Sequence, residues 1–598
     1  MRVINRIRQN KWLLVILVVG ACLRFFRPDQ QSFWLDEVLT MMSSDPSFTF
    51  GQTYKSVLFW EALPHLYFLG LKYFMLVFGY STLNARIFSA IIGLFGVYAM
   101  YLLGKAIYNR RSGLIAAAIT CVSVFHITYS QEARPYGMLF LFTVLSYYRL
   151  ILFVRNPTMR TALIYGVFSG LIINSHFFGI LTIGAQALLL LLILFKQDAS
   201  DRMKFLRLCF ASAGVILILA LPNIEALLHV AQIKSFWILQ PGPEAFTNMF
   251  KEFFGNAELL MFVINVLIIY YLFSVFRQKL VPGIKNFNGN RLILSFFVLC
   301  SWLVVSLVIS MLKSYLDVSM ILSRYFINIL PVFIIATAIG AARIRNAMVR
   351  NTIVGCLVVF SLIDLVVVRD YYNRPSKCQM REMTTALKAA NTNNAKIVTF
   401  YSWIYPFWFK DQPETKFESK SFDDYVTAMR ANEIGHEPFW YSNINPYALS
   451  EVNEKYLKEH FIRTKKLEYF DCWAYYYKPK KNSTQDGEGE ISLKIFKTAK
   501  FSDKGITFNQ SGSYISPPLD FKNGQYEMIL SGSSAEKTHF KIKANGNEIA
   551  DFFWEGENQQ QKITFDNLKQ NKVRFQIIFD NGATQRTAVI SDMKLNMK

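Results

Sequence analysis

The sequence lacks the glycine-rich motifs with which proteins hold nucleotides. It contains neither a G-x-x-x-x-G-K-[ST] phosphate loop nor a G-x-G-x-x-G dinucleotide fingerprint. Neither ATP-driven transport nor a soluble nucleotide-sugar fold is therefore indicated. Charged residues make up only 18% of the chain. The positive charges separate apolar segments and form no Lys/Arg-rich face or RNA-binding motif, so nucleic acid is not an expected partner.

Cysteine is also scarce, with seven in 598 residues, and the cysteines do not have the spacing of a metal site. Five of them lie in apolar segments, where cysteine usually behaves as a small hydrophobic residue. The other two, Cys378 and Cys472, lie near the start and the end of one candidate domain in the polar half. A disulfide between them requires that this half is exported and that the two sulfurs meet. The sequence leaves a disulfide and two free thiols equally open.

Long apolar runs dominate the first 370 residues. Hydrophobic residues make up 53% of the chain and aromatic residues 16%, which is high for a soluble protein. A helix needs about 20 apolar residues to cross a bilayer. About eleven segments approach that length, several of them short: 12–26, 87–107, 113–129, 137–154, 161–175, 177–195, 208–228, 257–276, 292–312, 326–342 and 352–368. We therefore predict a polytopic α-helical membrane protein with about 11 transmembrane helices.

The positive charges predict the orientation of these spans. Of the net charge of +22, +18 lies before Asp370, and alternate loops are basic, such as 105–111 and 343–350. Lys and Arg accumulate on the cytoplasmic side, so we expect a cytoplasmic N-terminus and, with an odd number of spans, extracytoplasmic C-terminal domains. The first span has no small-residue cleavage site after it and is predicted to be a retained anchor. The expected location is the plasma (inner) membrane.

One further apolar run, residues 63–79, is interrupted by His65 and Lys72. Counting this run as a twelfth span would invert every later loop against the charge pattern. We therefore predict an interfacial helix within a large first outside loop.

After residue 370 the pattern changes to that of a mixed α/β domain. Residues 371–480 combine an amphipathic stretch at 380–390 with strand-like runs such as AKIVTFYS and WAYYYK. Residues 481–490 are polar, contain glycine and lack periodicity, which is typical of a linker. We predict an extracytoplasmic α/β domain followed by this linker.

The remainder, residues 491–598, alternates apolar and polar residues in the manner of β-strands. Asn545-Gly546 and residues 580–582 have the composition of tight hairpin turns. A C-terminal β-sandwich fits this pattern. The sandwich could bind carbohydrate through Tyr526 or Trp554, but such aromatic residues are more often part of a core.

Two acidic sites lie on the same predicted face of the membrane half. Asp36 and Glu37 stand in SFWLDEVLT, directly after the first span, and Glu132 and Arg134 stand in YSQEARPYG at the outside end of the third. Such charges are either ordinary interfacial residues, with Glu132 and Arg134 pairing locally, or parts of a functional site. Two carboxylate sites on one face favour the functional reading.

The order of these motifs resembles that of a known enzyme group. A basic N-terminus and one span are followed by FWLDE, LPHLYFLGLKYFMLVFG, HITYSQEARPYG, NSHFF and, late in the membrane half, SRYFINILP. This order is similar to that of polytopic GT-C glycosyltransferases of the protein mannosyltransferase and aminoarabinose transferase group. The similarity covers roughly residues 1–370. It departs where many relatives begin the first-loop helix with His-Pro-Pro and this chain has Leu63, Pro64 and His65.

The resemblance implies a glycosyltransferase that moves a hexosyl or pentosyl group from a polyprenyl-phosphate donor. The acceptor would be a cell-envelope glycolipid, polysaccharide or protein on the extracytoplasmic side. Asp36 matches the family's catalytic position, where a base takes the proton from the acceptor hydroxyl as it attacks. Glu37 and Glu132 would orient Asp36 or the acceptor.

The leaving group of such a reaction is an anionic phosphate, which calls for fixed positive charge. Arg134 and Arg324 are candidates because arginine can hold phosphate oxygens in a bidentate fork, with Tyr325 as a neutral donor. Arg324 is alternatively an interfacial anchor. Histidines at helix ends are more often structural than functional. The candidate substrate contacts are His65, His176 and Tyr136.

The sequence offers no compact set of oxygen ligands, so we expect no cofactor; a divalent ion is possible, since carboxylates could hold one, but it is not expected to be obligatory. The main alternative function is a polytopic transporter or lipid flippase, which would carry Gly/Pro-broken helices and ionisable groups at mid-membrane. Here the charges gather at one face, which favours the enzyme. A third reading, an anchored sugar-binding or assembly protein, would need only a single span.

Overall fold

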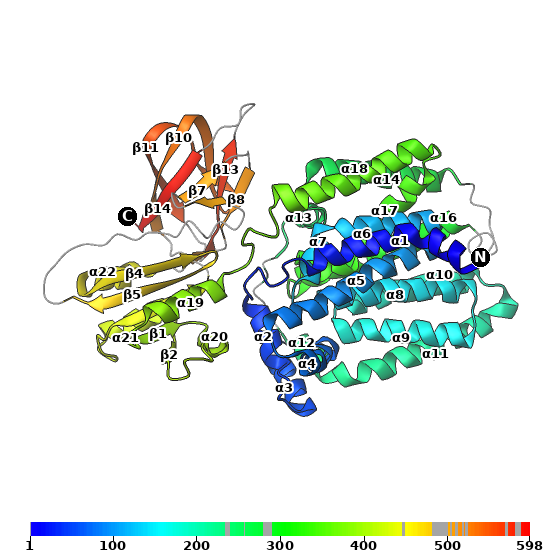
Figure 1. Cartoon of the computed structure of the whole chain (residues 1–598), viewed down its shortest axis with the longest axis horizontal. Helices are drawn as coiled ribbons and strands as arrows, with labels where there is room; N and C mark the ends of the chain where they lie inside the picture. Colours follow the sequence, from blue (N-terminus) through cyan, green and yellow to red (C-terminus); the bar gives the residue numbers. More distant parts are fainter. Residues whose placement is uncertain are drawn as a thin grey trace. The chain divides into compact units, whose positions relative to one another are not determined.

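The computed structural model divides by its contacts into two units (Figure 1). The first contains residues 1–30 and 39–374, and the second contains residues 31–38 and 375–598. The residues that the structure describes are 2–61, 63–233, 238, 240–255, 257–278, 290–444, 449–480, 500–502, 505–508, 512–516, 519–520, 524–567, 572–580 and 588–597.

The first unit is built of helices. One of them, α2 (Leu35–Ser43), is divided between the units, since its residues up to Val38 belong to the second unit and those from Leu39 to the first. The other helices of the first unit are α1 (Arg2–Phe25), α3 (Phe50–Trp60), α4 (Leu66–Phe78), α5 (Thr82–Ile107), α6 (Arg110–Val122), α7 (Val124–Ser130), α8 (Tyr136–Arg155), α9 (Met159–Ser175), α10 (Gly179–Lys196), α11 (Ala199–Ala220), η1 (Leu221–Asn223), α12 (Ile224–Ala231), α13 (Ala245–Phe253), α14 (Glu258–Phe276), α16 (Arg291–Leu316), η2 (Ser323–Asn328), α17 (Leu330–Arg343), α18 (Ala347–Ile363) and η3 (Asp364–Val368).

Within the described part of the chain, seven helices are long and apolar enough to cross a membrane, or eight if the bent pair α6 and α7 is one span. All eleven predicted segments are helical in the structure, but α9 has only 17 residues and α17 only 14. The chain is therefore a polytopic α-helical membrane protein, as predicted. The count of eleven spans stays a prediction.

Helix α4 covers most of the apolar run that we excluded from the spans. Its 13 residues extend about 20 Å at 1.5 Å per residue, which is less than the roughly 30 Å hydrocarbon core. Lys72 within α4 is buried, and its ammonium group donates to the carbonyl of Phe48. The short length and the buried charge agree with the predicted interfacial helix.

Helices of the first unit approach closely where glycine replaces a side chain. A Cβ on Gly104 of α5 would lie 2.8 Å from the Cα of Gly113 on α6, and a Cβ on Gly340 of α17 would lie 2.1 Å from the carbonyl oxygen of Leu267 on α14. Real Cβ atoms essentially never make contacts this short. Small residues at such crossings let helix backbones pack in lipid, where apolar surface alone does not drive association.

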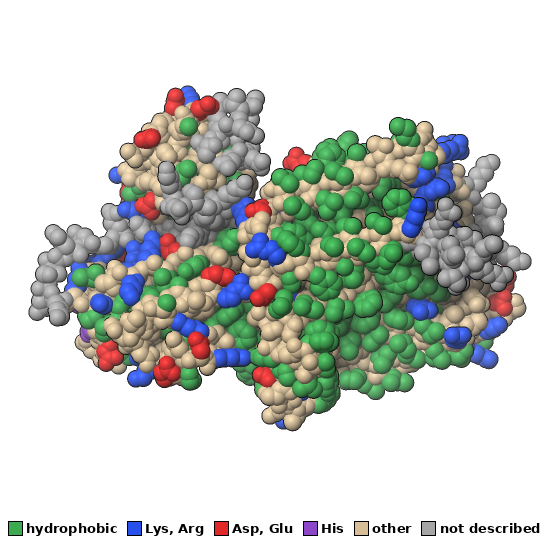
Figure 2. Space-filling view, viewed as in Figure 1, with side chains coloured by type: hydrophobic (Ala, Val, Ile, Leu, Met, Phe, Trp, Pro, Cys, Tyr) green, Lys and Arg blue, Asp and Glu red, His purple; other side chains and the backbone are tan. Residues whose placement is uncertain are grey.

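Hydrophobic side chains cover most of the visible face of the helical unit (Figure 2). On α14, for example, Phe262, Ile269, Phe273 and Phe276 are all more than half exposed. Lys and Arg side chains gather toward the end of the unit at which Figure 1 marks the N-terminus. An apolar belt that ends in basic residues is the surface expected of a protein in a bilayer.

The second unit contains a mixed α/β region that begins after the last membrane helix. Its five strands form one sheet in the order β2-β1-β3-β5-β4, in which β1 is parallel to β2 and β3, and β5 is antiparallel to β3 and β4. The predicted helix at 380–390 is α19. The elements are α19 (Met380–Ala390), β1 (Lys396–Thr399), η4 (Ser402–Ile404), α20 (Tyr405–Trp408), β2 (Phe417–Ser419), α21 (Phe422–Arg430), β3 (Phe439–Ile444), α22 (Glu451–His460), β4 (Phe461–Tyr469) and β5 (Cys472–Pro479).

Cys378 and Cys472 are both buried in this region and are free thiols. The Sγ of Cys378 donates to the carbonyl oxygen of Asp471 at 3.3 Å. The structure therefore pairs neither cysteine in a disulfide.

The C-terminal region is rich in β-strands. They are β6 (Lys500–Ser502), β7 (Gly505–Phe508), β8 (Gly512–Ile515), β9 (Leu519–Asp520), β10 (Gly524–Ala544), β11 (Asn547–Asn567), β12 (Lys572–Val573), β13 (Phe575–Asp580) and β14 (Ala588–Met597). The long strands β10 and β11 form an antiparallel hairpin, and β10 pairs along its first part with β14 and along its last part with β13. Two-residue turns of this kind require positive φ at both positions, and Asn545 and Gly546 have φ of 50° and 87°.

Tyr526 and Trp554 are 8% and 2% exposed and belong to the core of the β-rich region. A side chain packed in a core cannot stack on a sugar, so the carbohydrate-binding reading of these two residues is wrong. Residues 581–582 of the predicted turn at 580–582 lie outside the described residues, as does the predicted linker at 481–490. The domain boundaries stay predictions.

Candidate functional site

The motif SQEARPYG forms a buried loop between α7 and α8. All of residues 130–137 are buried, whereas connecting segments usually lie on the surface. The backbone N–H of Arg134 donates to the carbonyl of Glu132 at 2.8 Å, and Nε2 of Gln131 donates to the carbonyls of Arg24 and Phe26 at 2.9 and 3.0 Å. The turn at Arg134 and the hydrogen bonds of Gln131 to the end of α1 therefore hold the charged side chains of Glu132 and Arg134 in the interior.

Arg134 makes a buried ion pair that the sequence did not reveal. Its Nη1 donates to Oε1 of Glu61 at 2.6 Å and to the hydroxyl of Thr40 at 2.8 Å, and the Thr40 hydroxyl lies 3.3 Å from the same Glu61 oxygen. The Arg134 and Glu61 side chains are 5% and 4% exposed. Glu61 is thus a partner of Arg134 that the sequence analysis did not name.

An aromatic cluster surrounds Tyr325 of η2. Its ring centroid lies 5.2 Å from that of Phe178, 5.4 Å from that of His176 and 6.2 Å from that of Tyr136, the first residue of α8. The guanidinium of Arg324 stands 5.6 Å from the centre of the Tyr325 ring. The motifs SQEARPYG, NSHFF and SRYFINILP, which are far apart in sequence, thus meet in the first unit.

His176 shows that positive charge converges on this cluster. Its Nδ1 accepts from the backbone N–H of Phe178 at 3.2 Å. Burial, followed by the charges of Arg134 and Arg324, lowers the pKa of His176 to about 3. The imidazole is therefore neutral at physiological pH, with Nδ1 as acceptor and Nε2–H as donor.

A second carboxylate that the sequence did not single out lies close to Arg324. Glu252, on α13, accepts a hydrogen bond from the hydroxyl of Ser323. Desolvation raises the pKa of Glu252, while the Ser323 hydrogen bond and the Arg324 charge oppose this rise. Each candidate arginine thus has a carboxylate close to it, Glu61 for Arg134 and Glu252 for Arg324.

Asp36 and Glu37 lie in the first turn of α2, where a helix N-terminus favours negative charge. Asp36 is partly exposed, whereas the Glu37 side chain is fully buried. Oε2 of Glu37 lies 3.4 Å from the ammonium group of Lys377. Glu37 thus has a cationic partner that the sequence did not indicate.

His65 lies in a structural network apart from the aromatic cluster. Its Nδ1 is 3.1 Å from Oδ1 of Asn223, its Nε2 is 3.2 Å from the carbonyl oxygen of Tyr54, and its ring stacks on that of Tyr54. Burial lowers the pKa of His65, and the hydrogen bonds to Asn223 and Tyr54 oppose the shift. These contacts favour a role in fixing the start of α4.

Residues 63–224 match a family model described as dolichyl-phosphate-mannose-protein mannosyltransferase. A curated relative, dolichyl-phosphooligosaccharide-protein glycotransferase 1 of Pyrococcus horikoshii, is 30% identical over 154 residues, which are 23% of this chain and only 16% of that protein. The crystal structure of ArnT from Cupriavidus metallidurans in the apo state superposes with a TM-score of 0.52 and 11% identity, covering 78% of this chain and 98% of that one. The chain has a GT-C glycosyltransferase fold of the protein mannosyltransferase and ArnT type.

The match to the family model covers helices α4 to α11 and the loops between them. It includes SQEARPYG with Glu132 and Arg134, and NSHFF with His176. Asp36, in the segment before it, and Arg324, after it, lie outside the matched residues. The GT-C fold therefore rests on the central helices, and the roles of individual residues rest on the geometry of this chain.

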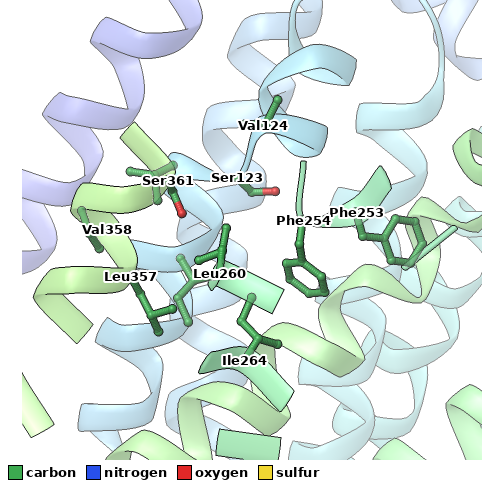
Figure 3. Close-up of a pocket in the computed structure, with 11 residues that line it drawn as sticks. Ser123, Val124, Phe253, Phe254, Leu260, Ile264, Leu357, Val358 and Ser361 are labelled. Carbon is green, nitrogen blue, oxygen red and sulfur yellow. The ribbon is translucent and has the colours of Figure 1, made fainter. Parts of the chain in front are cut away.

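Among the described residues, a small cavity lies where α6 meets α7, between α13, α14 and α18 (Figure 3). Its volume is about 20 Å³, which is room for about one water molecule. Leu260, Ile264 and Leu357 give it an apolar lining, with the hydroxyls of Ser123 and Ser361 among them. None of the candidate site residues named above lines this cavity, and the cavity is too small for a sugar.

Within the described ranges, no group of three or more His, Cys, Asp or Glu side chains is placed to hold a metal ion. Independence from a divalent ion stays a prediction.

Several site residues escaped the sequence analysis: Thr40, Glu61, Phe178, Glu252 and Lys377. Phe178 lies within NSHFF and is the one that the motif itself signals. Glu61 is an isolated carboxylate in the first loop, between Trp60 and an apolar run, and such isolation is a weak signal for a buried partner.

Proposed function

We propose that this protein is an integral membrane glycosyltransferase that moves a sugar from a polyprenyl-phosphate donor to an acceptor on the extracytoplasmic side. The matching family and the curated relative are both named for donors that carry a sugar on dolichyl phosphate. The observation that carries the proposal is the convergence of Arg134 and Arg324 on the neutral, buried His176 beside Tyr325. Two guanidinium groups and two neutral donors are the chemistry that a phosphate leaving group requires.

In the proposed reaction, the acceptor hydroxyl oxygen attacks the anomeric carbon of the sugar. The bond from that carbon to the phosphate oxygen breaks, and its electron pair leaves with the polyprenyl phosphate. Asp36 takes the hydroxyl proton, and its partial exposure at the start of α2 suits a base that must reach an acceptor. Glu37 and Glu132 orient Asp36 or the acceptor.

The charge that develops on the phosphate is stabilised by Arg134, Arg324 and the Tyr325 hydroxyl. Arg134 offers a fixed geometry because Glu61 and Thr40 hold its Nη1. His176 and Tyr136 contact the substrate through neutral donors. Because His176 stays neutral, it adds a hydrogen bond and no further charge to the site.

The location follows from the charge pattern. We propose that the N-terminus is cytoplasmic and that the α/β and β-rich regions lie outside the plasma (inner) membrane, because the basic loops alternate along the first 370 residues. The acceptor is a cell-envelope glycolipid, polysaccharide or protein. The donor requires no nucleotide, in keeping with the absence of nucleotide-binding motifs from the sequence.

Transfer by the purified full-length chain in nanodiscs tests the proposal. The protein is supplied with a panel of polyprenyl-phosphate sugars and a membrane lipid extract, and labelled sugar in the acceptor fraction is measured. Transfer from one member of the panel is expected and would name the donor. If folded protein transfers no sugar but moves the same lipids across vesicle membranes, the flippase reading replaces this one.

A further inference from the structure

Within the second unit, three contacts join residues 376–381, which lead into the α/β region, to residues 31–37, which carry the proposed base. The backbone N–H of Ser376 donates to Oε1 of Gln31 at 2.9 Å. The backbone N–H of Arg381 donates to the hydroxyl of Ser32, also at 2.9 Å. The third contact is the ion pair of Lys377 with Glu37. Residues 31–37 thus contact residues 376–381 at three points.

Ser32 acts as a helix cap from a distant part of the chain. Arg381 is the second residue of α19, and the first N–H groups of a helix have no partner within the helix. The residue before α19, Gln379, makes no capping hydrogen bond with its side chain. The buried hydroxyl of Ser32 supplies an acceptor instead. This contact fixes Lys377, three residues before α19, against the start of α2.

The Lys377–Glu37 pair is more than a surface contact. The Glu37 side chain is fully buried and that of Lys377 is 13% exposed. A buried carboxylate without a nearby cation is costly, because desolvation disfavours its charged form. Lys377 supplies a cation to this buried carboxylate, one residue after Asp36.

We propose that Lys377 is a positioning residue for the transfer reaction: its ammonium group holds Glu37 and thereby fixes the first turn of α2, which carries Asp36. This inference rests on the proposed function, since it needs Asp36 to be the base. Lys377 itself touches neither donor nor acceptor.

The test compares kcat and donor KM for wild type, K377M, K377R and E37Q, with the double variant E37Q/K377M, in the full-length chain. We expect K377M to lower kcat about tenfold or more and to leave KM within about twofold, because the pair acts on the geometry of the transition state. K377R, which keeps the charge, should recover most of kcat. K388M, which breaks an ion pair of α19 with Asp411, is the matched control and should leave both constants unchanged.

The double variant decides whether Lys377 acts through Glu37. If it does, E37Q/K377M has the kcat of E37Q within about twofold, since removal of the ammonium group then has nothing further to disturb. This comparison is informative even if K377M alone folds poorly, because the double variant removes the buried carboxylate together with its cation. A further tenfold loss in the double variant, or a failure of K377R to recover activity in folded protein, would overturn the inference.

D36N separates this inference from the proposed function. If D36N retains wild-type transfer, the proposed function fails and the inference fails with it. If D36N is inactive and K377M has wild-type kcat, the proposed function stands and the positioning role of Lys377 is wrong.

Discussion

Removal of the Glu61 carboxylate should destabilise the first unit, which holds the membrane helices, by about 3–5 kcal/mol. This is the usual cost of removing one member of a buried ion pair. The pair is short, at 2.6 Å, and both side chains are about 95% buried, so water cannot replace the lost carboxylate without opening the structure. In Glu61→Ala, the Nη1 of Arg134 loses its carboxylate partner and keeps the hydrogen bond to the Thr40 hydroxyl. Glu61→Gln keeps an acceptor oxygen and should cost less, about 1–2 kcal/mol.

The free energy of unfolding can be measured in mixed micelles by titration with a denaturing detergent, with helicity as the signal. The double variant E61M/R134M removes both charges and fills the space with apolar atoms, so it should cost less than either single variant. D317A is a matched control, since the exposed, solvent-screened Lys313–Asp317 pair should contribute little to stability. If the double variant loses the sum of the two single losses, the two side chains are not coupled and the reasoning is wrong.

Two further predictions concern pH and metal. The pKa of His176 is about 3 in the folded protein and near 6.5 in the unfolded chain. The unfolded state therefore binds the proton first, and the free energy of unfolding falls as the pH drops from 6.5 towards 3. Between pH 7 and pH 5, wild type should lose about 2 kcal/mol that His176→Gln does not lose, measured by the same detergent titration. Because the carboxylates are proposed to act as base and positioning groups, EDTA should leave the transfer rate within about twofold, and a loss restored by a divalent ion would show a metal requirement.

The spans and their connections could be predicted because lipid imposes a simple rule on sequence. A segment must be apolar over a fixed length, and the basic loops mark its ends, so all eleven predicted segments are helical and α4 is too short to cross. The helix at 380–390 and the turn at Asn545-Gly546 follow from equally local patterns. The number of true spans did not follow, because short helices such as α17 satisfy the apolar rule and fall below the length rule.

The partners of the site residues could not be predicted, because they come from segments that no local pattern connects. Arg134 could be named from its motif, yet its ion pair with Glu61 joins two different loops of the membrane unit. Glu37 could be named beside Asp36, yet Lys377 lies 340 residues later in the chain. Alternation in β10 and β11 could not tell which aromatics face the core, and Tyr526 and Trp554 prove to be buried.

The central claim is that Asp36 is the base of a sugar transfer from a polyprenyl phosphate. The most direct test measures release of polyprenyl phosphate from a labelled donor by wild type and Asp36→Asn in the same nanodiscs, with acceptor present and with equal unfolding profiles. Loss of a general base typically costs 10²- to 10⁴-fold, so the account predicts a rate lower by about that factor in the variant. A rate equal to that of wild type would contradict it.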